Sequence, residues 1–188
     1  MNVVPLFHMH GQITNLLSSL VSGASMIATP GFEHGPEAVF EWMARCQPTW
    51  YSAVPTIHLK LLQYGQTLEA THATGAKSPY SLRLIRNSSA FLLPSIARAI
   101  EEFFGVVVLT TYAMSEADPI ASNPRNIKDR QLNSVGFAAG PSVRVCRWDD
   151  GSVCNVGEHG EVCVHGENVI SGYEHRDRNG GEFRSQPT

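Results

Sequence analysis

Hydrophobic positions along the first 117 residues alternate between a spacing typical of buried strands and one typical of helices. Short apolar runs predict five strands, over residues 2–7, 24–29, 50–54, 82–85 and 106–109. Between them, apolar residues three and four apart predict four helices, over residues 13–22, 36–47, 55–66 and 94–104. Residues 67–78 are polar and small, which predicts a surface loop.

This alternation of continuous apolar strands with helices predicts an α/β fold with a parallel, five-stranded, doubly wound sheet. Such sheets bind ligands at the carboxyl ends of their strands. The segments that directly follow predicted strands are therefore the candidates for a site: residues 8–11, 87–92 and 110–117.

The pattern changes after Pro119. Short alternating runs at residues 143–146 and 161–164, set among many glycines, predict a small antiparallel β unit. We therefore divide the chain into an α/β lobe over residues 1–118, a partial β-barrel-like subdomain over 119–175 and an irregular tail over 176–188.

Composition narrows the possible partners. The 188 residues are 43% hydrophobic and 16% charged, with a formal net charge of −3, which suits a folded core and gives no reason to expect nucleic acid as a partner. The apolar runs are shorter than a membrane span requires. No targeting signal is evident and the four cysteines form no C-x-x-C pair, so we expect a cytoplasmic protein with reduced thiols.

The run from Tyr112 to Glu116 offers an aromatic face, a hydroxyl and a carboxylate after a predicted strand. That set could stack on a base, hydrogen-bond a phosphate and hold a hard cation. On composition alone, a polar loop that caps the strand is the alternative that we favour.

Other polar pairs leave alternatives open. His8 and His10 would share a face of a strand as metal ligands, although a pocket histidine or a structural histidine is favoured over a metal. A second group does not match the usual zinc spacings, and buried thiols are favoured there; it consists of Cys154, His159, Cys163 and His165. Residues 74–78 resemble a phosphate loop but lack its first glycine, so a surface loop is favoured.

Six runs in order resemble the adenylate-forming acyl-CoA synthetase superfamily over residues 2–175. They are VPLFHMHG at 4–11, TWYSAVPTIH at 49–58, SSAFL at 88–92, YAMSEA at 112–117, SVG at 134–136 and GEVCVHGENVISGY at 160–173. Ala113, the run at 49–58 and residues 122–124 resemble the oxalate–CoA ligase branch, which is similar to the 4-coumarate–CoA ligases.

This resemblance implies ATP or AMP, Mg²⁺, CoA and a small carboxylic acid as ligands. By position, Tyr112 would stack on adenine, Ser115 would contact the α-phosphate and Glu116 would hold Mg²⁺. The residues expected around the nucleotide and the acid are Ser89, Ala90, Ala113 and Met114, with His8 beside the reacting carboxylate. A metal and hydroxyl donors would stabilise the charge that builds up when the carboxylate attacks the α-phosphate.

The sequence also departs from the family pattern. Its triphosphate-binding loop would precede His8, and its ribose-binding Thr-Gly-Asp run and lysine-bearing C-terminal domain would follow Tyr173. After Glu116 this chain reads ADPI at residues 117–120, where the branch carries serine and histidine in a slightly longer loop.

Three hypotheses follow from these departures. The first is an acid–CoA ligase for oxalate or another small carboxylate that is inactive as this isolated chain. The second is a non-catalytic, truncated binding module that self-associates through the surface a missing lobe would cover. The third is a fragment with no independent role.

Overall fold

The computed structural model describes residues 1–71, 80–175, 179 and 183. Its helical segments are η1 (His10–Leu17), α1 (Ser18–Val21), η2 (Phe32–His34), α2 (Gly35–Cys46), α3 (Pro55–Thr71) and α4 (Pro94–Phe104). Its strands are β1 (Trp50–Ala53), β2 (Leu84–Asn87), β3 (Val107–Met114), β4 (Ala117–Ser122), β5 (Phe137–Ala138), β6 (Ser142–Cys146) and β7 (Glu161–His165). None of these described helices combines the length and the apolar character that crossing a membrane requires.

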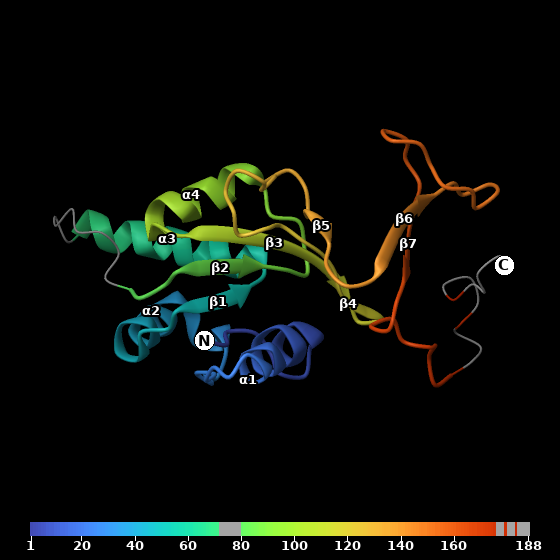
Figure 1. Cartoon of the computed structure of the whole chain (residues 1–188). Helices are drawn as coiled ribbons and strands as arrows, with labels where there is room; N and C mark the ends of the chain where they lie inside the picture. The colour runs from blue at the N-terminus through green and yellow to red at the C-terminus, as the bar shows by residue number, and fades with distance from the viewer. Residues whose placement is uncertain (72–79, 176–178, 180–182, 184–188) are drawn as a thin grey trace.

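The main sheet has five strands in the order β1-β2-β3-β4-β5, as Figure 1 shows. Only β1, β2 and β3 are parallel; β4 and β5 are antiparallel to their neighbours. The prediction of a five-stranded parallel sheet is therefore wrong, although the α/β class is right. The reason lies in β3, which continues past the predicted end at residue 109 and pairs with β4 through a tight turn at Ser115 and Glu116.

Two of the predicted strands are absent from the described structure. Residues 2–7 contribute one isolated bridge, between Asn2 and Ser52, and residues 24–29 form no ladder. The two segments touch through a hydrogen bond from the Asn2 amide to the Ile27 carbonyl, while the Thr29 hydroxyl donates to the Asn2 carbonyl. The Thr29 hydroxyl thus occupies the Asn2 carbonyl, an acceptor that a β ladder would use.

The predicted helices over residues 36–47, 55–66 and 94–104 are confirmed as α2, α3 and α4. α3 runs on to Thr71, so the loop prediction for 67–78 is wrong at its start, and its remainder lies outside the described residues. Proline opens α3 and α4, and Gly105 ends α4 with a positive φ of 66°. The cyclic side chain suits a first helical turn, and glycine adopts the left-handed backbone without a Cβ clash.

The two faces of the parallel strands pack against different segments. Side chains alternate along each strand, so Tyr51, Ile85 and Val108 share one face and pack into the main core with α2, α3 and α4. The other face carries Ser52 and Arg86 together with Trp50, Leu84, Val107 and Leu109, and η1 contacts it at β1. One face therefore holds the fold together through its apolar core, and the other presents Ser52 to the amino-terminal helix.

The helix predicted over residues 13–22 exists as η1 and α1, but its apolar side chains do not form the buried face. Its buried residues are His10, Gly11, Thr14, Asn15 and Ser19. Leu17, Leu20 and Val21 are exposed. The helix thus presents polar side chains to Ser52 of β1 and to Asn2.

The predicted antiparallel β unit is confirmed as the β6–β7 ladder, which lies apart from the main sheet in Figure 1. A second, smaller core joins it to β4, where Ile120 packs with Val143 and Val164. The domain boundaries at residues 118 and 175 stay predictions.

Candidate functional site

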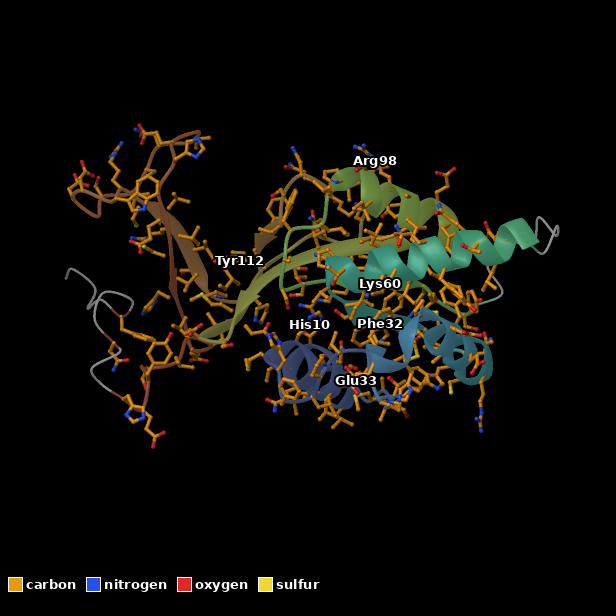
Figure 2. All side chains as sticks on the ribbon, turned by 180° about the vertical axis from the view of Figure 1, so that it is seen from behind. His10, Phe32, Glu33, Lys60, Arg98 and Tyr112 are labelled. Carbon is orange, nitrogen blue, oxygen red and sulfur yellow. The ribbon has the colours of Figure 1, made fainter. Side chains whose placement is uncertain are left out.

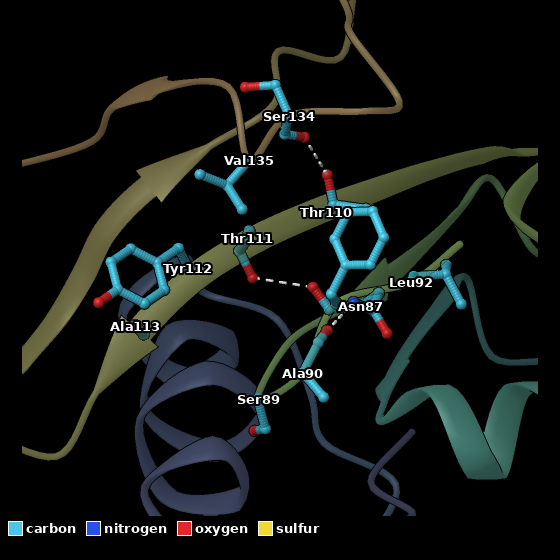
Figure 3. A pocket seen from close by; sticks show the side chains of 11 residues that line it. Asn87, Ser89, Ala90, Leu92, Thr110, Thr111, Tyr112, Ala113, Ser134 and Val135 are labelled. Atoms are coloured by element: carbon cyan, nitrogen blue, oxygen red, sulfur yellow. Dashed lines mark hydrogen bonds between the residues drawn. The ribbon is translucent and has the colours of Figure 1, made fainter. Parts of the chain in front are cut away.

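Two adjoining cavities open at the carboxyl ends of β2 and β3. The first encloses about 250 Å³ and is lined by Asn87, Ser89, Ala90, Phe91, Leu92, Thr110, Thr111, Tyr112, Ala113, Ser134 and Val135 (Figure 3). The second encloses about 150 Å³ and is lined by His8, Met9, His10, Thr14, Ser88, Ser89, Ala113, Met114, Ser115 and Asp118. Ser89 and Ala113 belong to both.

The cavities bring together all but one of the site residues predicted from the sequence. Ala90 and Tyr112 line the first cavity, and His8, Met114 and Ser115 line the second. Glu116 lines neither of them. The rule that ligands bind after parallel strands therefore located the parts of both cavities that follow β2 and β3, but it did not identify residues of neighbouring segments such as Thr14 and Val135. His8 follows no strand of the described structure.

Ser89 lies where the cavities meet, in a backbone conformation that side chains rarely adopt. Its φ is +69°, in the left-handed region that a non-glycine residue enters at an energetic cost. Its hydroxyl is within hydrogen-bond distance of His10 Nδ1, at 3.1 Å. The turn that holds Ser89 is tied to β3 by the Thr111 hydroxyl, which donates to the Asn87 carbonyl (3.0 Å; Figure 3).

The first cavity suits a flat ring that carries an amino group. The Tyr112 ring supplies an aromatic face, and Leu92 and Val135 supply apolar walls. Asn87 donates from Nδ2 to the Ala90 carbonyl at 2.9 Å, so the other polar atom of the Asn87 side chain is the acceptor Oδ1. That Oδ1 is buried and has no hydrogen-bond partner among the described residues, so an acceptor is left for a donor that a ligand would bring. Adenine has both features.

Asn123 holds the wall of the first cavity in place. Its side-chain amide lies 2.6 Å from Thr110 Oγ1 and 2.7 Å from the Ser134 carbonyl, and its Oδ1 accepts from the Gln131 amide at 2.9 Å. Because Ser134 and Val135 line the cavity, Asn123 fixes that wall against β3. Its side chain was not assigned a role from the sequence, although residues 122–124 were noted as a family run.

His10 is a buried histidine with partners on both ring nitrogens. Its Nε2 lies 2.6 Å from the Ser52 hydroxyl, and its Nδ1 faces Ser89. Burial lowers the pKa of His10 to about 4, with smaller contributions from the charges of Arg86 and His8. The ring is therefore neutral at physiological pH, and it connects the sheet to the point where the cavities meet. Figure 2 shows His10 at the start of the helix and Tyr112 on β3.

His8 accepts a hydrogen bond from the backbone. The His10 amide donates to His8 Nδ1 at 3.1 Å, so in the neutral ring the proton is on Nε2. This contact occupies one of the two ring nitrogens through which His8 could bind a metal. No group of three or more potential metal ligands occurs in the part of the chain that the structure describes, which also disfavours zinc at Cys154, His159, Cys163 and His165. The phosphate-loop alternative at residues 74–78 lies outside the described residues.

Glu116 occupies the turn between β3 and β4. Its carboxylate accepts a hydrogen bond from the Tyr173 hydroxyl, and its backbone carbonyl accepts from the Ile170 amide at 2.9 Å. Among the described residues it belongs to no group of three or more His, Cys, Asp or Glu side chains that could hold a metal. Glu116 fits a Mg²⁺ ion that keeps several waters and substrate oxygens, because such sites often use a single protein carboxylate.

Asp118 and Arg86 add charge near the second cavity. Arg86 donates from Nε to Thr111 Oγ1 at 3.2 Å. Burial raises the pKa of the Asp118 carboxyl, and the nearby Arg86 charge partly offsets this rise. Asp118 belongs to the run 117–120, where the sequence departs from the family pattern, and no role is predicted for it from the sequence.

Comparison with known proteins identifies the family of this chain. The model of the AMP-binding enzyme family matches residues 1–174, and the chain belongs to that family. It is 39% identical to the probable CoA ligase CCL9 of Humulus lupulus and 37% identical to the oxalate–CoA ligase of Arabidopsis thaliana, each over 92% of this chain. In both cases the match spans 32% of the relative, so the chain corresponds to about a third of their length.

A solved structure, ATP-bound MatB from Rhodopseudomonas palustris, superimposes with a TM-score of 0.81 at 32% identity. The match covers 97% of this chain and 34% of MatB. A second, the MenE synthetase of Bacillus subtilis with ATP and magnesium, gives a TM-score of 0.77 at 26% identity over 97% of this chain and 36% of that one.

Proposed function

We propose that this chain forms the adenine- and acid-binding part of an AMP-forming acid–CoA ligase for a small carboxylic acid. The observation that carries the proposal is the pair of cavities that meet at Ser89 and Ala113. One suits a nucleobase and the other a small polar group, as a reaction between an acid and a nucleotide requires. Family membership and the similarity to CoA ligases support it.

In the proposed reaction, a carboxylate oxygen of the acid attacks the α-phosphorus of ATP and pyrophosphate leaves. The thiol sulfur of CoA then attacks the acyl carbon, loses its proton, and releases AMP. Tyr112 stacks on adenine between Ala90 and Ala113, and Ser115 contacts the α-phosphate. Met114 and Ser89 line the path between the cavities, and the Nε2–H of His8 donates to the carboxylate. Mg²⁺ on Glu116 would neutralise phosphate charge.

We assign these roles to an α/β lobe over residues 1–118, with residues 119–175 as the partial β-barrel-like subdomain and 176–188 as a tail. Because the relatives are about three times longer, we propose that the complete reaction needs more chain than these 188 residues. The isolated chain should then show negligible ATP–pyrophosphate exchange with oxalate or other small acids. Robust exchange would overturn this point.

Nucleotide binding tests the site directly. Calorimetry should show AMP binding in the millimolar range, about −4 kcal/mol. Tyr112→Ala should abolish it because the stacking surface is lost, while Trp148→Ala should not, since Trp148 is an exposed aromatic residue outside both cavities. Micromolar binding would contradict the expected weakness, and binding that survives Tyr112→Ala would contradict the assignment of the adenine cavity.

A second candidate is a binding module that associates with another copy of itself. Exposed apolar side chains on and before the amino-terminal helix favour it: Leu6, Phe7, Leu17, Leu20 and Val21, of which Phe7 is 88% exposed. Surfaces of this kind favour association. Light scattering should then detect a dimer that Phe7→Ser weakens, and a monodisperse monomer would count against it.

A further inference from the structure

We infer that Asp118 selects the acid that the second cavity accepts. The cavity is suited to a small carboxylic acid with a hydroxyl or amino group next to its carboxyl group, and it disfavours a dicarboxylate. This inference rests on the proposed function, because it takes the second cavity as the acid site.

Asp118 lines this cavity as a half-buried carboxylate without a partner. No hydrogen bond or ion pair reaches its side chain from the described residues, whose ion pairs are Arg130–Glu101 and Arg147–Glu158. Carboxylates that leave water are normally paired or hydrogen-bonded, because desolvation of the charge is costly. The acceptors of Asp118 are therefore available to a donor in the cavity.

Arg86 does not supply that donor. Its Nε is engaged by the Thr111 hydroxyl, and it forms no ion pair with Asp118 in the described structure. Its charge acts on Asp118 through space and offsets part of the cost of burial. The Asp118 carboxylate is thus half-buried, and none of the described residues donates a hydrogen bond to it.

Other lining residues supply hydrogen-bond donors. His8 has the donor Nε2–H, and Ser89 and Ser115 have hydroxyls, so these residues suit the carboxylate of the substrate. Asp118 is the one carboxylate among the lining residues. An ionised carboxylate accepts hydrogen bonds and donates none, so it pairs with a hydroxyl or an ammonium group and repels a second carboxylate.

The size of the cavity limits the ligand. A volume of about 150 Å³ corresponds to roughly five water molecules at liquid density, so an acid of few heavy atoms fits. Glycolate and glycine carry the required donor, acetate lacks it, and oxalate replaces it with a second carboxylate. These four acids differ by single groups and serve as probes.

Saturation-transfer NMR on the purified chain measures the affinities of the four acids. The wild-type chain should bind glycolate or glycine more tightly than acetate, and oxalate most weakly. Of glycolate and glycine, the acid that the wild-type chain binds more tightly has an affinity advantage over acetate. Asp118→Asn should reduce this advantage by about tenfold, the low end for a hydrogen bond to a charged group. It should also improve oxalate binding. Asp118→Ser should act in the same direction, which guards against a folding defect in one variant. Glu102→Gln removes one exposed carboxylate from α4 and should change nothing.

The outcomes separate this inference from the proposed function. Oxalate that binds as tightly as glycolate, or discrimination that survives Asp118→Asn, would overturn the inference while AMP binding at Tyr112 still supports the proposed function. AMP binding without binding of any acid would also overturn it, because the second cavity would not be the acid site. Loss of both AMP and acid binding would overturn the proposed function itself.

Discussion

Two helices of similar apolar content are used in opposite ways. α4 buries Ala97, Ile100 and Phe104 in the main core. The helix formed by η1 and α1 instead buries polar residues such as His10 and Asn15 and exposes Leu20 and Val21. Both have apolar residues at helical spacing, so the spacing alone does not tell which side of a helix faces the fold.

The difference lies in what each helix packs against. α4 packs in the core with Tyr51, Ile85 and Val108, where burial of hydrocarbon is the driving force. The amino-terminal helix faces Ser52 and Asn2, where each buried polar atom needs a partner: His10 lies by Ser52, and Asn15 donates to Asn2 Oδ1 at 2.7 Å. One helix therefore stabilises the core, and the other builds a polar cavity wall.

The largest expected effect is in α4. Ile100→Ala should lower the free energy of unfolding by about 2–5 kcal/mol, because a fully buried side chain is replaced by a cavity. Leu20→Ala in the amino-terminal helix should cost only about 0.5 kcal/mol, as for surface positions. Urea denaturation measures both, and similar losses would break the comparison.

Acid should weaken the amino-terminal helix before α4. The pKa of His10 is about 4 in the folded state, against about 6.5 when unfolded, so between these values the unfolded chain binds a proton that the folded chain does not. Stability should therefore fall as the pH drops from about 6.5 to about 4, and His10 should account for about 2 kcal/mol at pH 5.

Urea denaturation of the wild type and His10→Gln at pH 7 and pH 5 isolates this contribution. Burial also lowers the pKa of His58 to about 4. Because His58 remains in both proteins, its contribution to the loss of stability on acidification is the same in each. If His10→Gln retained the whole loss of stability on acidification, the assignment to His10 would be wrong.

The paired asparagines should have a smaller effect. Asn15→Ala leaves the buried Asn2 Oδ1 without its donor and should cost about 1–3 kcal/mol. Gln12→Ala, at an exposed position of the same helix, provides the matched control. A double-mutant cycle with Asn2→Ala measures the coupling, and a coupling of zero would mean that the hydrogen bond does not orient the helix.

The smallest change in stability is expected at Val21, which is 87% exposed. Val21→Ser should change the free energy of unfolding by no more than about 0.5 kcal/mol. Sedimentation equilibrium should nevertheless show weaker self-association if the exposed apolar side chains contact a second copy. A stability loss as large as that of Ile100→Ala would show that Val21 is buried.

The sequence predicted the elements whose pattern reflects local physics. Pro94 and Gly105 located α4, and the apolar run before Thr110 located β3. The extent of β3 was not predictable from this run, because its second half is stabilised by β4 across a turn and no longer by apolar burial. The same holds for residues 2–7, where the Thr29 hydroxyl replaces a ladder contact.

For the site, the resemblance and the strand-end rule located Tyr112, Ser89 and His8 at the cavities. The tertiary partners of the site residues were not predictable from the sequence. Asn123 acts through a loop that folds back on Thr110, and His10 is positioned by Ser52, 42 residues away. Asp118 was noticed as a difference, but its position in a cavity without a partner required the fold.

The passage of β3 along both cavities makes its length a structural constraint. Tyr112 and Ala113 line the first cavity and Ala113 and Met114 the second, and the register of β3 against β4 shifts between Tyr112 and Met114. Because side chains alternate along a strand, one residue inserted before Tyr112 would turn the side chains that follow it to the other face of the sheet. The relative placement of the two ligands is thus encoded in a number of residues, and substitutions that preserve the length of β3 leave it intact.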